Sequence, residues 1–154
     1  MPRSTTRISD LSQIVPVFPL SGVILLPRAQ LPLNIFEPRY LAMIDDAMAG
    51  DRLIAMVQTA GGSATRPNLA AVGCVGKINS FTETQDGRYL ISLTGICRAR
   101  LGAELAVQSP YRQVRLDYGP FEDDLSPAPE DLEGIDRPRL IAALNVYLRR
   151  RQLE

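Results

Sequence analysis

Residues 31–40, with the sequence LPLNIFEPRY, carry the chain from an extended segment into its first clear helix. Gln30 to Phe36 is expected to be extended, with Pro32 as an interruption. Pro38 suits the first turn of a helix, because the N–H group that proline lacks would have no intrahelical partner there. We expect a helix that opens at Glu37, ends at Gly50 and packs one apolar stripe against a sheet: Tyr40, Leu41, Ile44, Ala47 and Met48.

Short strands are expected on both sides of this helix. Residues 15–20 predict an edge strand, since a sheet edge tolerates Pro16 and Pro19, and residues 23–26 predict a further extended piece. After the helix, residues 52–59 predict a strand and residues 60–68 a flexible loop that contains glycine. Residues 105–107 and 111–118 predict a final pair of strands. Five or more strands with one early helix favour a mainly β (α+β) fold, a barrel or sandwich that carries a helix.

The dipeptide Asp86-Gly87, between two β-rich segments, predicts a type I′ hairpin turn with a two-residue loop. This turn pairs Gln85 with Arg88, and therefore Phe81 with Ser92 and Gly76 with Cys97. In that register one face of the hairpin is apolar and the other is polar and exposed to solvent. The predicted apolar face holds Val72, Cys74, Gly76, Ile78, Leu93, Gly95, Cys97, Ala99 and Leu101. The two cysteines become diagonal neighbours on it, and we expect buried free thiols rather than a disulfide.

The composition changes after the last predicted strand. From Asp117 to Asp136 all eight charged residues are acidic, and three prolines occur among them, which predicts an acidic linker over residues 120–135. Asp136 is expected to cap a second helix over residues 137–152. The predicted division is a β domain at 14–119, the linker, and the start of a helical part at 136–154. The helix has an apolar stripe that the barrel, a further helical portion or another copy of the chain must cover: Leu140, Ile141, Leu144, Tyr147 and Leu148.

The residue types argue against an enzyme, a metal site and a bound cofactor. The chain has no histidine and two cysteines, whose spacing fits no metal motif. Residues 73–77 fail the phosphate-loop pattern because Ala71 and Ile78 stand where it needs a glycine and a hydroxyl residue. Lys77 and Ser92, the candidate Ser–Lys pair, lie on the order of 13 Å apart in the predicted register. The carboxylates around the first helix are expected to form a cap and a solvated face rather than a metal or acid–base site: Glu37, Asp45, Asp46 and Asp51.

Charge and hydropathy argue against a nucleic-acid partner and a membrane partner. The formal net charge is zero, whereas a nucleic-acid binder normally carries a basic excess. Arginines 98, 100, 112 and 115 are expected to form a salt-bridged solvated face with Glu83 and Glu104 rather than a basic strip. Prolines break the apolar stretch from Ile14 to Phe36, so it does not predict a membrane helix. The N-terminal residues do not predict a signal peptide, and we expect a cytoplasmic protein.

Leu20, Pro27 and the stretch LPLNIFEPRY, followed by Gly73, Gly95 and Arg98, resemble the N-terminal substrate-binding domain of Lon proteases. The resemblance covers about residues 15–118 and is to free-standing bacterial members without ATPase or protease modules. It implies a PUA-like β pseudo-barrel with one embedded helix, followed by a helical part. It also implies a non-catalytic polypeptide-binding module. The implied partners are unfolded or damaged polypeptides and a protease or chaperone, and weak self-association is a further expectation.

Six apolar residues are the candidate polypeptide-binding residues, because they lie in proline-broken segments that neighbouring strands cannot fully pair: Val17, Phe18, Leu33, Ile35, Phe36 and Tyr40. The alternative is that their side chains fill the barrel. Glu37 and Arg39 are expected to be structural. A second functional hypothesis is an RNA-binding module, because PUA-like barrels also occur in RNA-modifying proteins. A third, an unrecognised hydrolase, is weakened by the absence of histidine.

Overall fold

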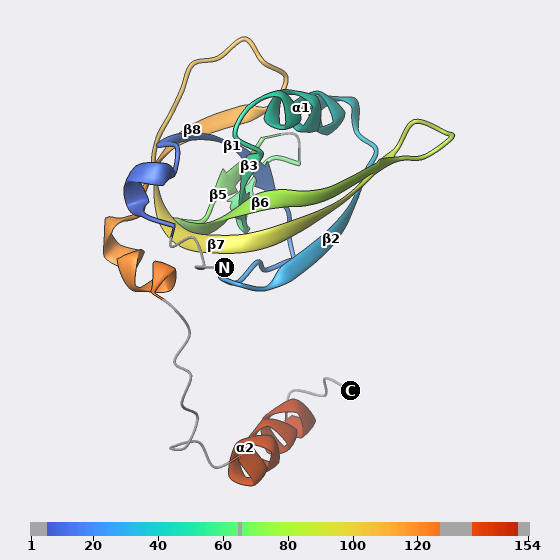
Figure 1. Cartoon of the computed structure of the whole chain (residues 1–154). Helices are drawn as coiled ribbons and strands as arrows, with labels where there is room; N and C mark the ends of the chain where they lie inside the picture. Colours follow the sequence, from blue (N-terminus) through green and yellow to red (C-terminus); the bar gives the residue numbers. More distant parts are fainter. Residues whose placement is uncertain (1–5, 65, 127–136, 151–154) are drawn as a thin grey trace, which may run out of the picture.

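The computed structural model describes residues 6–64, 66–126 and 137–150, and it shows a small β barrel with a helix on one side (Figure 1). The six-stranded sheet has the order β2-β7-β6-β3-β1-β8, and a further pairing of β7 with β8 closes five of the strands into a barrel. The strands of this sheet are β1 (Ile14–Pro19), β2 (Gln30–Ile35), β3 (Leu53–Val57), β6 (Val72–Glu83), β7 (Tyr89–Glu104) and β8 (Arg112–Asp117). The remaining elements are α1 (Pro38–Ala49), the ribbon of β4 (Thr59–Gly62) and β5 (Pro67–Leu69), α2 (Arg137–Arg150), and the 3-10 helices η1 (Ile8–Asp10) and η2 (Gly119–Leu125). The predicted mainly β fold with one embedded helix is confirmed.

Two apolar cores lie on opposite faces of the strands. The inner core fills the closed barrel with residues from all five of its strands, such as Val17, Ala55 and Val75. The outer core lies between the sheet and α1, and it contains Ile54 and Ile44. β3 contributes to both cores, and all five of its residues are buried. A strand that is covered on both faces needs a continuous apolar run rather than an alternating one.

A bulge lets β7 contribute to both cores. Gly76 pairs with Gly95, but Val75 pairs with Cys97, so Ile96 is an extra residue in β7. Such a bulge reverses the faces that the following residues occupy. The predicted register was therefore wrong, and Cys74 does not share a face with Cys97: Cys74 lies in the outer core and Cys97 in the inner one. The expectation of buried free thiols is confirmed.

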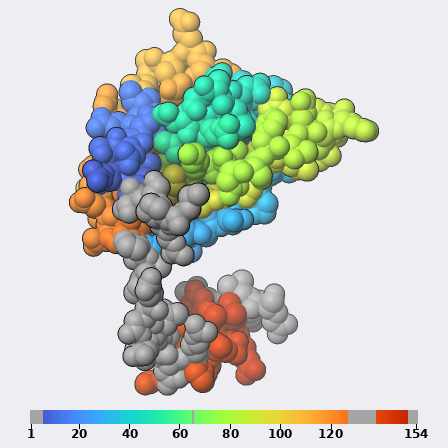
Figure 2. All heavy atoms as spheres, in the orientation of Figure 1, coloured from blue at the N-terminus to red at the C-terminus, as the bar shows by residue number. Residues whose placement is uncertain are grey.

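The tip of the β6–β7 hairpin also differs from the two-residue turn predicted. Thr84 donates its N–H to the carbonyl of Arg88, and Gly87 donates to the carbonyl of Thr84, at 2.8 and 3.1 Å. Gly87 has a φ of 83°, so the loop contains three residues and ends in a left-handed glycine. As a result Phe81 pairs with Ile91, and Ser92 pairs with Ser80. Figure 2 shows this hairpin projecting beyond the rest of the barrel.

The edge of the sheet is β2 rather than β1. β1 lies between β3, to which it is parallel, and β8. Pro16 comes one residue before the first β1–β3 partner, Val17, and Pro19 is the last residue of β1. In β2, alternation along the antiparallel ladder turns the backbone of Leu33 and Ile35 toward β7 and that of Pro32 and Asn34 outward. Pro32 therefore lies on a free edge, where its missing N–H breaks no ladder bond.

Helix α1 begins and ends where the sequence predicts. Pro38 is its first residue and Gly50 follows its last. The predicted stripe is mostly correct, but Met43, which it omitted, is fully buried. The side chains of Asp45 and Asp46, on the polar face of α1, accept hydrogen bonds from Tyr89 Oη and Tyr111 Oη at 2.8 and 2.5 Å.

Three predicted segments need correction. Residues 60–68 were expected to be a flexible loop, but most of β4 and most of β5 lie within them. Residues 105–107 are not a strand, since β7 ends at Glu104, and the extended piece expected at residues 23–26 belongs to no strand. The predicted linker does not begin at residue 120, because η2 packs Phe121 and Leu125 against the inner core. The rest of the linker, residues 127–136, lies outside the described residues.

The second helix is confirmed as α2, from Arg137 to Arg150. Most of its predicted apolar stripe is exposed: Leu140, Ile141, Leu144 and Tyr147. Within the described part of the chain, no helix is long and apolar enough to span a membrane.

Candidate functional site

The segment between β1 and β2, residues 21–29, crosses the sheet as a strap that covers part of the outer core. Its central residue, Leu25, is buried. A Cβ atom on Gly95 would lie 2.0 Å from the Leu26 carbonyl oxygen, and one on Gly76 would lie 2.7 Å from Leu25 Cδ2. Gly95 also donates to the Ala29 carbonyl and accepts from the Arg28 N–H, both at 2.8 Å. The two glycines therefore allow the strap to lie directly on β6 and β7.

Polar contacts fix both ends of the strap. At its start, Gln58 accepts a hydrogen bond from the Gly22 N–H at 3.2 Å, and its amide donates to the Val23 carbonyl. At its end, Arg28 has a left-handed φ of 69°. The Arg28 guanidinium donates to the carbonyl of Ser126, the residue after η2. The strap is thus fastened to β3, β7 and the end of η2.

A shallow groove of about 170 Å³ lies between the strap and the start of β6. We call it the strap groove, and it is lined by Val23, Ile24, Leu25, Leu26, Met56, Gln58, Val72, Gly73, Cys74 and Arg98. Ile24 and Leu26 are 70% and 58% exposed. Val72 is also exposed. The groove therefore presents apolar side chains to the surroundings.

The one charged side chain that lines the strap groove, Arg98, is held in an ion pair. Its Nε and Nη2 donate to the two carboxylate oxygens of Asp124 at 2.9 and 2.8 Å. Its guanidinium also lies over the ring of Phe121, 4.7 Å from the centroid. The hydrogen bond from Arg98 lowers the pKa of the Asp124 carboxyl below its usual value. The groove therefore offers apolar contact and a neutralised charge. It is also lined by the Cys74 thiol, whose pKa burial raises to about 12, so that this thiol stays protonated at neutral pH.

The structure places most of the six predicted binding residues in the cores. Four of them are buried: Val17, Phe18, Ile35 and Tyr40. The rings of Phe18 and Tyr40 stack at 4.4 Å between centroids. Leu33 is half-buried against the outer core, and Phe36 is 64% exposed. The alternative was that these side chains fill the barrel. Val17 does lie in the inner core of the barrel, whereas Phe18, Ile35 and Tyr40 lie in the outer core.

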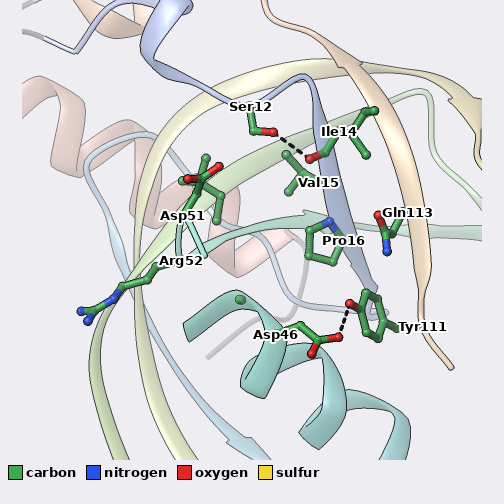
Figure 3. A pocket seen from close by; sticks show the side chains of 11 residues that line it. Ser12, Ile14, Val15, Pro16, Asp46, Asp51, Arg52, Tyr111 and Gln113 are labelled. Atoms are coloured by element: carbon green, nitrogen blue, oxygen red, sulfur yellow. Dashed lines mark hydrogen bonds between the residues drawn. The ribbon is translucent and has the colours of Figure 1, made fainter. Parts of the chain in front are cut away.

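A second, more polar hollow of about 130 Å³ lies beside the end of α1 and the start of β1 (Figure 3). Tyr111 and Asp46 point toward each other inside it, joined by their hydrogen bond. Burial and this bond raise the pKa of Tyr111 to about 12, so its hydroxyl stays protonated at neutral pH. Ser12 Oγ, which also lines the hollow, donates to the Ile14 carbonyl at 2.9 Å. No group of metal-ligating side chains occurs among the described residues.

Sequence reasoning missed the exposed residues of the strap groove. Ile24, Leu26 and Val72 were taken as parts of strands, and an apolar run without periodicity cannot show which of its members face outward. A usable signal was present in the pair of glycines at 76 and 95, which mark a close approach of backbone.

The closed barrel, its embedded helix and the crossing strap define the class, which is a small mainly β barrel domain of the kind seen in a Lon N-terminal domain structure. A sequence model of the ATP-dependent protease La (LON) substrate-binding domain matches residues 14–151. The chain belongs to this family.

Relatives and solved structures agree with this assignment. The chain is 27% identical to a protein named Lon protease 2 from Myxococcus xanthus over 129 residues, which are 82% of this chain and 15% of that protein. It is 29% identical to Lon protease of Syntrophus aciditrophicus over 127 residues, 76% of this chain and 16% of that protein. The chain thus spans about 15% of the length of these curated relatives.

Two solved structures share the fold. A Lon N-terminal domain protein from Xanthomonas campestris matches with a TM-score of 0.56 and 26% identity, covering 68% of this chain and 59% of that one. The N-terminal domain of a Lon protease from the Mycobacterium avium complex matches with a TM-score of 0.57, covering 90% of this chain and 69% of that one, and its 21% identity supports the fold alone.

Proposed function

We propose that this domain recognises polypeptides without acting on them chemically, and that the strap groove is where it contacts their apolar side chains. The observation that carries the proposal is the exposure of Ile24 and Leu26 at the rim of the groove. Exposed apolar groups that line a hollow favour contact with another apolar surface. The family description, a substrate-binding domain of a protease, supports a polypeptide as that partner.

The size of the groove favours a single segment of chain over the broad surface of a folded protein. About 170 Å³ accommodates one or two apolar side chains, whether the segment that carries them is extended or helical. Such a site tolerates many sequences, because apolar burial is not directional. A low affinity is expected, since fully burying one such side chain contributes about 1.5–3 kcal/mol.

The free edge of β2 supplies a second mode of contact. Its outward backbone groups are the N–H and carbonyl of Asn34 and the carbonyl of Pro32, and these bind any extended chain regardless of its sequence. Phe36, at the end of β2, is the one exposed member of the predicted set, and with half-buried Leu33 it stays in the proposed contact surface. The proline limits how many bonds an added strand can form, which also protects the edge from aggregation.

The proposed partners are unfolded or damaged polypeptides in the cytoplasm, with a protease or chaperone as the recipient of the bound chain. The proposal assigns the domain a recognition role only.

A titration with a fluorescently labelled, permanently unfolded model protein tests the proposal. Fluorescence anisotropy measures the binding, and we expect a Kd in the high micromolar range for the unmodified protein. Ile24→Asp should weaken the affinity at least about five-fold, because it removes one apolar contact of about 1 kcal/mol or more. The matched control is Val107→Asp, which places the same charge on an exposed valine that does not line the groove. Equal binding by the two variants would remove the strap groove from the proposal, and absence of binding by the unmodified protein would end it.

The RNA-binding alternative lacks a specific observation in its favour. Of the four arginines in the predicted strip, Arg98 is bound to Asp124 and Arg112 is bound to Glu104. The prediction that Glu104 forms a salt bridge with one of these arginines is thus confirmed, whereas Arg98 pairs with Asp124 rather than with Glu83. Salt-dependent binding of a structured RNA in a gel shift would favour the alternative.

A further inference from the structure

Helix α2 carries an apolar face that is largely exposed. Its residues Leu140, Ile141, Leu144 and Tyr147 are between 52% and 60% exposed. They recur at helical spacing and form one stripe about 10 Å long, given a rise of about 1.5 Å per residue. A 14-residue helix is marginal alone in water and normally gains its stability by packing such a face.

The chain leaves the barrel toward α2 directly beside the strap groove. Ser126, the last described residue before α2, is bound through its carbonyl to Arg28 at the end of the strap. Two residues earlier, Asp124 is bound to Arg98, which lines the groove. The ten residues 127–136 then lead to α2, and ten residues span at most about 35 Å when fully extended. The apolar stripe of α2 is therefore kept within reach of the groove.

The charges on the two elements are complementary. The described part of α2 contains no acidic residue, and it ends in Arg149 and Arg150. The 3-10 helix η2, whose Phe121 lies under Arg98 of the groove, exposes Glu122 and Asp123. Docking of α2 near the groove brings basic and acidic side chains to the same region, which favours that approach over one to a basic surface.

We propose that α2 docks its apolar stripe on the strap groove of its own barrel and thereby competes with polypeptides for that surface. This regulation rests on the proposed function, whereas the docking itself does not. A polypeptide must displace α2 to bind, so its affinity is reduced by the fraction of molecules in which the groove is covered. Contact within one chain benefits from an effective concentration on the order of millimolar for a short tether. A contact with an intrinsic Kd of about 0.1–0.5 mM then covers the groove in roughly two thirds to nine tenths of the molecules.

Two variants on α2 test the competition. Leu144→Asp places a charge in the apolar stripe, and Ala142→Asp places the same charge two residues away, about 200° around the helix. We expect Leu144→Asp to raise the affinity for the unfolded model protein by about three- to ten-fold, and Ala142→Asp to leave it unchanged. If both variants bind like the unmodified protein, the competition is disproved.

Hydrogen exchange measures the docking without any ligand. We expect Ile24→Asp, on the strap, to speed the exchange of α2 amides, although the two elements are more than 100 residues apart in sequence. Val107→Asp serves as the control and should leave α2 unchanged. Equal exchange in all three proteins would overturn the docking, and protection of α2 that grows with protein concentration would overturn it in favour of a second copy as the occupant. If no variant binds the model protein but Ile24→Asp still exposes α2, the proposed function fails and the docking stands.

Discussion

Replacing Gly95 by alanine is the sharpest test of how the strap is held. The new Cβ atom would lie 2.0 Å from the Leu26 carbonyl oxygen and 2.8 Å from its carbon. Both atoms belong to backbone, so no side-chain rotation relieves the overlap. A normal non-bonded separation exceeds 3 Å, and the strap must therefore move by more than about 1 Å.

The free-energy cost follows from what this movement breaks. Gly95 exchanges two hydrogen bonds with Ala29 and Arg28, each of which contributes about 1 kcal/mol net. The same movement withdraws Leu25 from the outer core, where it is buried, and the loss of that burial costs about 1.5–3 kcal/mol. We therefore expect Gly95→Ala to lower the free energy of unfolding by about 3–5 kcal/mol.

Urea denaturation followed by far-UV circular dichroism measures this difference, since the chain contains no tryptophan for fluorescence. Leu25→Ala separates the contributions, because it removes the buried side chain but leaves the backbone contact, and its expected cost is about 2–5 kcal/mol. Gly119→Ala is the control, since its nearest neighbour is the movable Asp117 carboxylate at 3.2 Å. If Gly95→Ala costs less than about 1 kcal/mol, the strap does not lie against β7 as described.

Three further outcomes follow from the titratable groups. The pKa of Tyr111 is raised to about 12. The stability that its neutral hydroxyl contributes is therefore complete below pH 10 and is lost as the pH rises toward 12. The absorbance of the phenolate at high pH measures this ionisation. Arg98→Gln is expected to destabilise the protein slightly at pH 7, because solvent screens this partly exposed ion pair. Urea titrations should show the difference shrinking as the pH falls from about 4, because Asp124, whose pKa Arg98 lowers, then loses its charge. Burial raises the pKa values of Cys74 and Cys97 to about 12 and about 11, so neither thiol should react with a thiol reagent at pH 8 until urea unfolds the protein; rapid labelling of the native protein would contradict this.

The elements with local signals were predictable from the sequence. Pro38 and Gly50 bracket α1 because the first helical turn needs no N–H from proline and a glycine stops the helix. The hairpin at Asp86-Gly87 was recognised, yet its loop is one residue longer than predicted. Both turn types contain Asp and Gly, and only the pairing of the strands decides between them.

The bulge at Ile96 was hidden by the regularity of the sequence. Residues 91, 93, 95, 97 and 99 are all buried, which has the period of a strand with a single apolar face. The bulge adds one residue at the point where β7 passes from the outer core to the inner one, so the same spacing serves opposite faces. Position in the barrel, rather than periodicity, determines which core each residue enters.

The prediction that the binding residues would be exposed was wrong for most of them, for a related reason. Proline-broken apolar segments were expected to resist full pairing, but β1 is paired on both sides, and Val17 and Phe18 are consequently buried. A proline at the end of a paired stretch costs no ladder bond, as at Pro19. In the six-stranded sheet only β2 has a free edge. Phe36, the residue after β2, is the member of the predicted set with an exposed side chain.

The geometry of the strap explains why we infer a binding partner from its apolar surface. In an extended backbone successive side chains point to opposite sides, so the burial of Leu25 turns Ile24 and Leu26 outward. Folding requires an apolar residue at position 25, where the core must be filled, but it does not require one at 24 or 26, where polar side chains would be better solvated. Burying either residue against a polypeptide or against α2 recovers free energy that the isolated barrel cannot obtain. The proposed binding, to a polypeptide or to α2, would account for the apolar character of these two positions, which the stability of the barrel does not require.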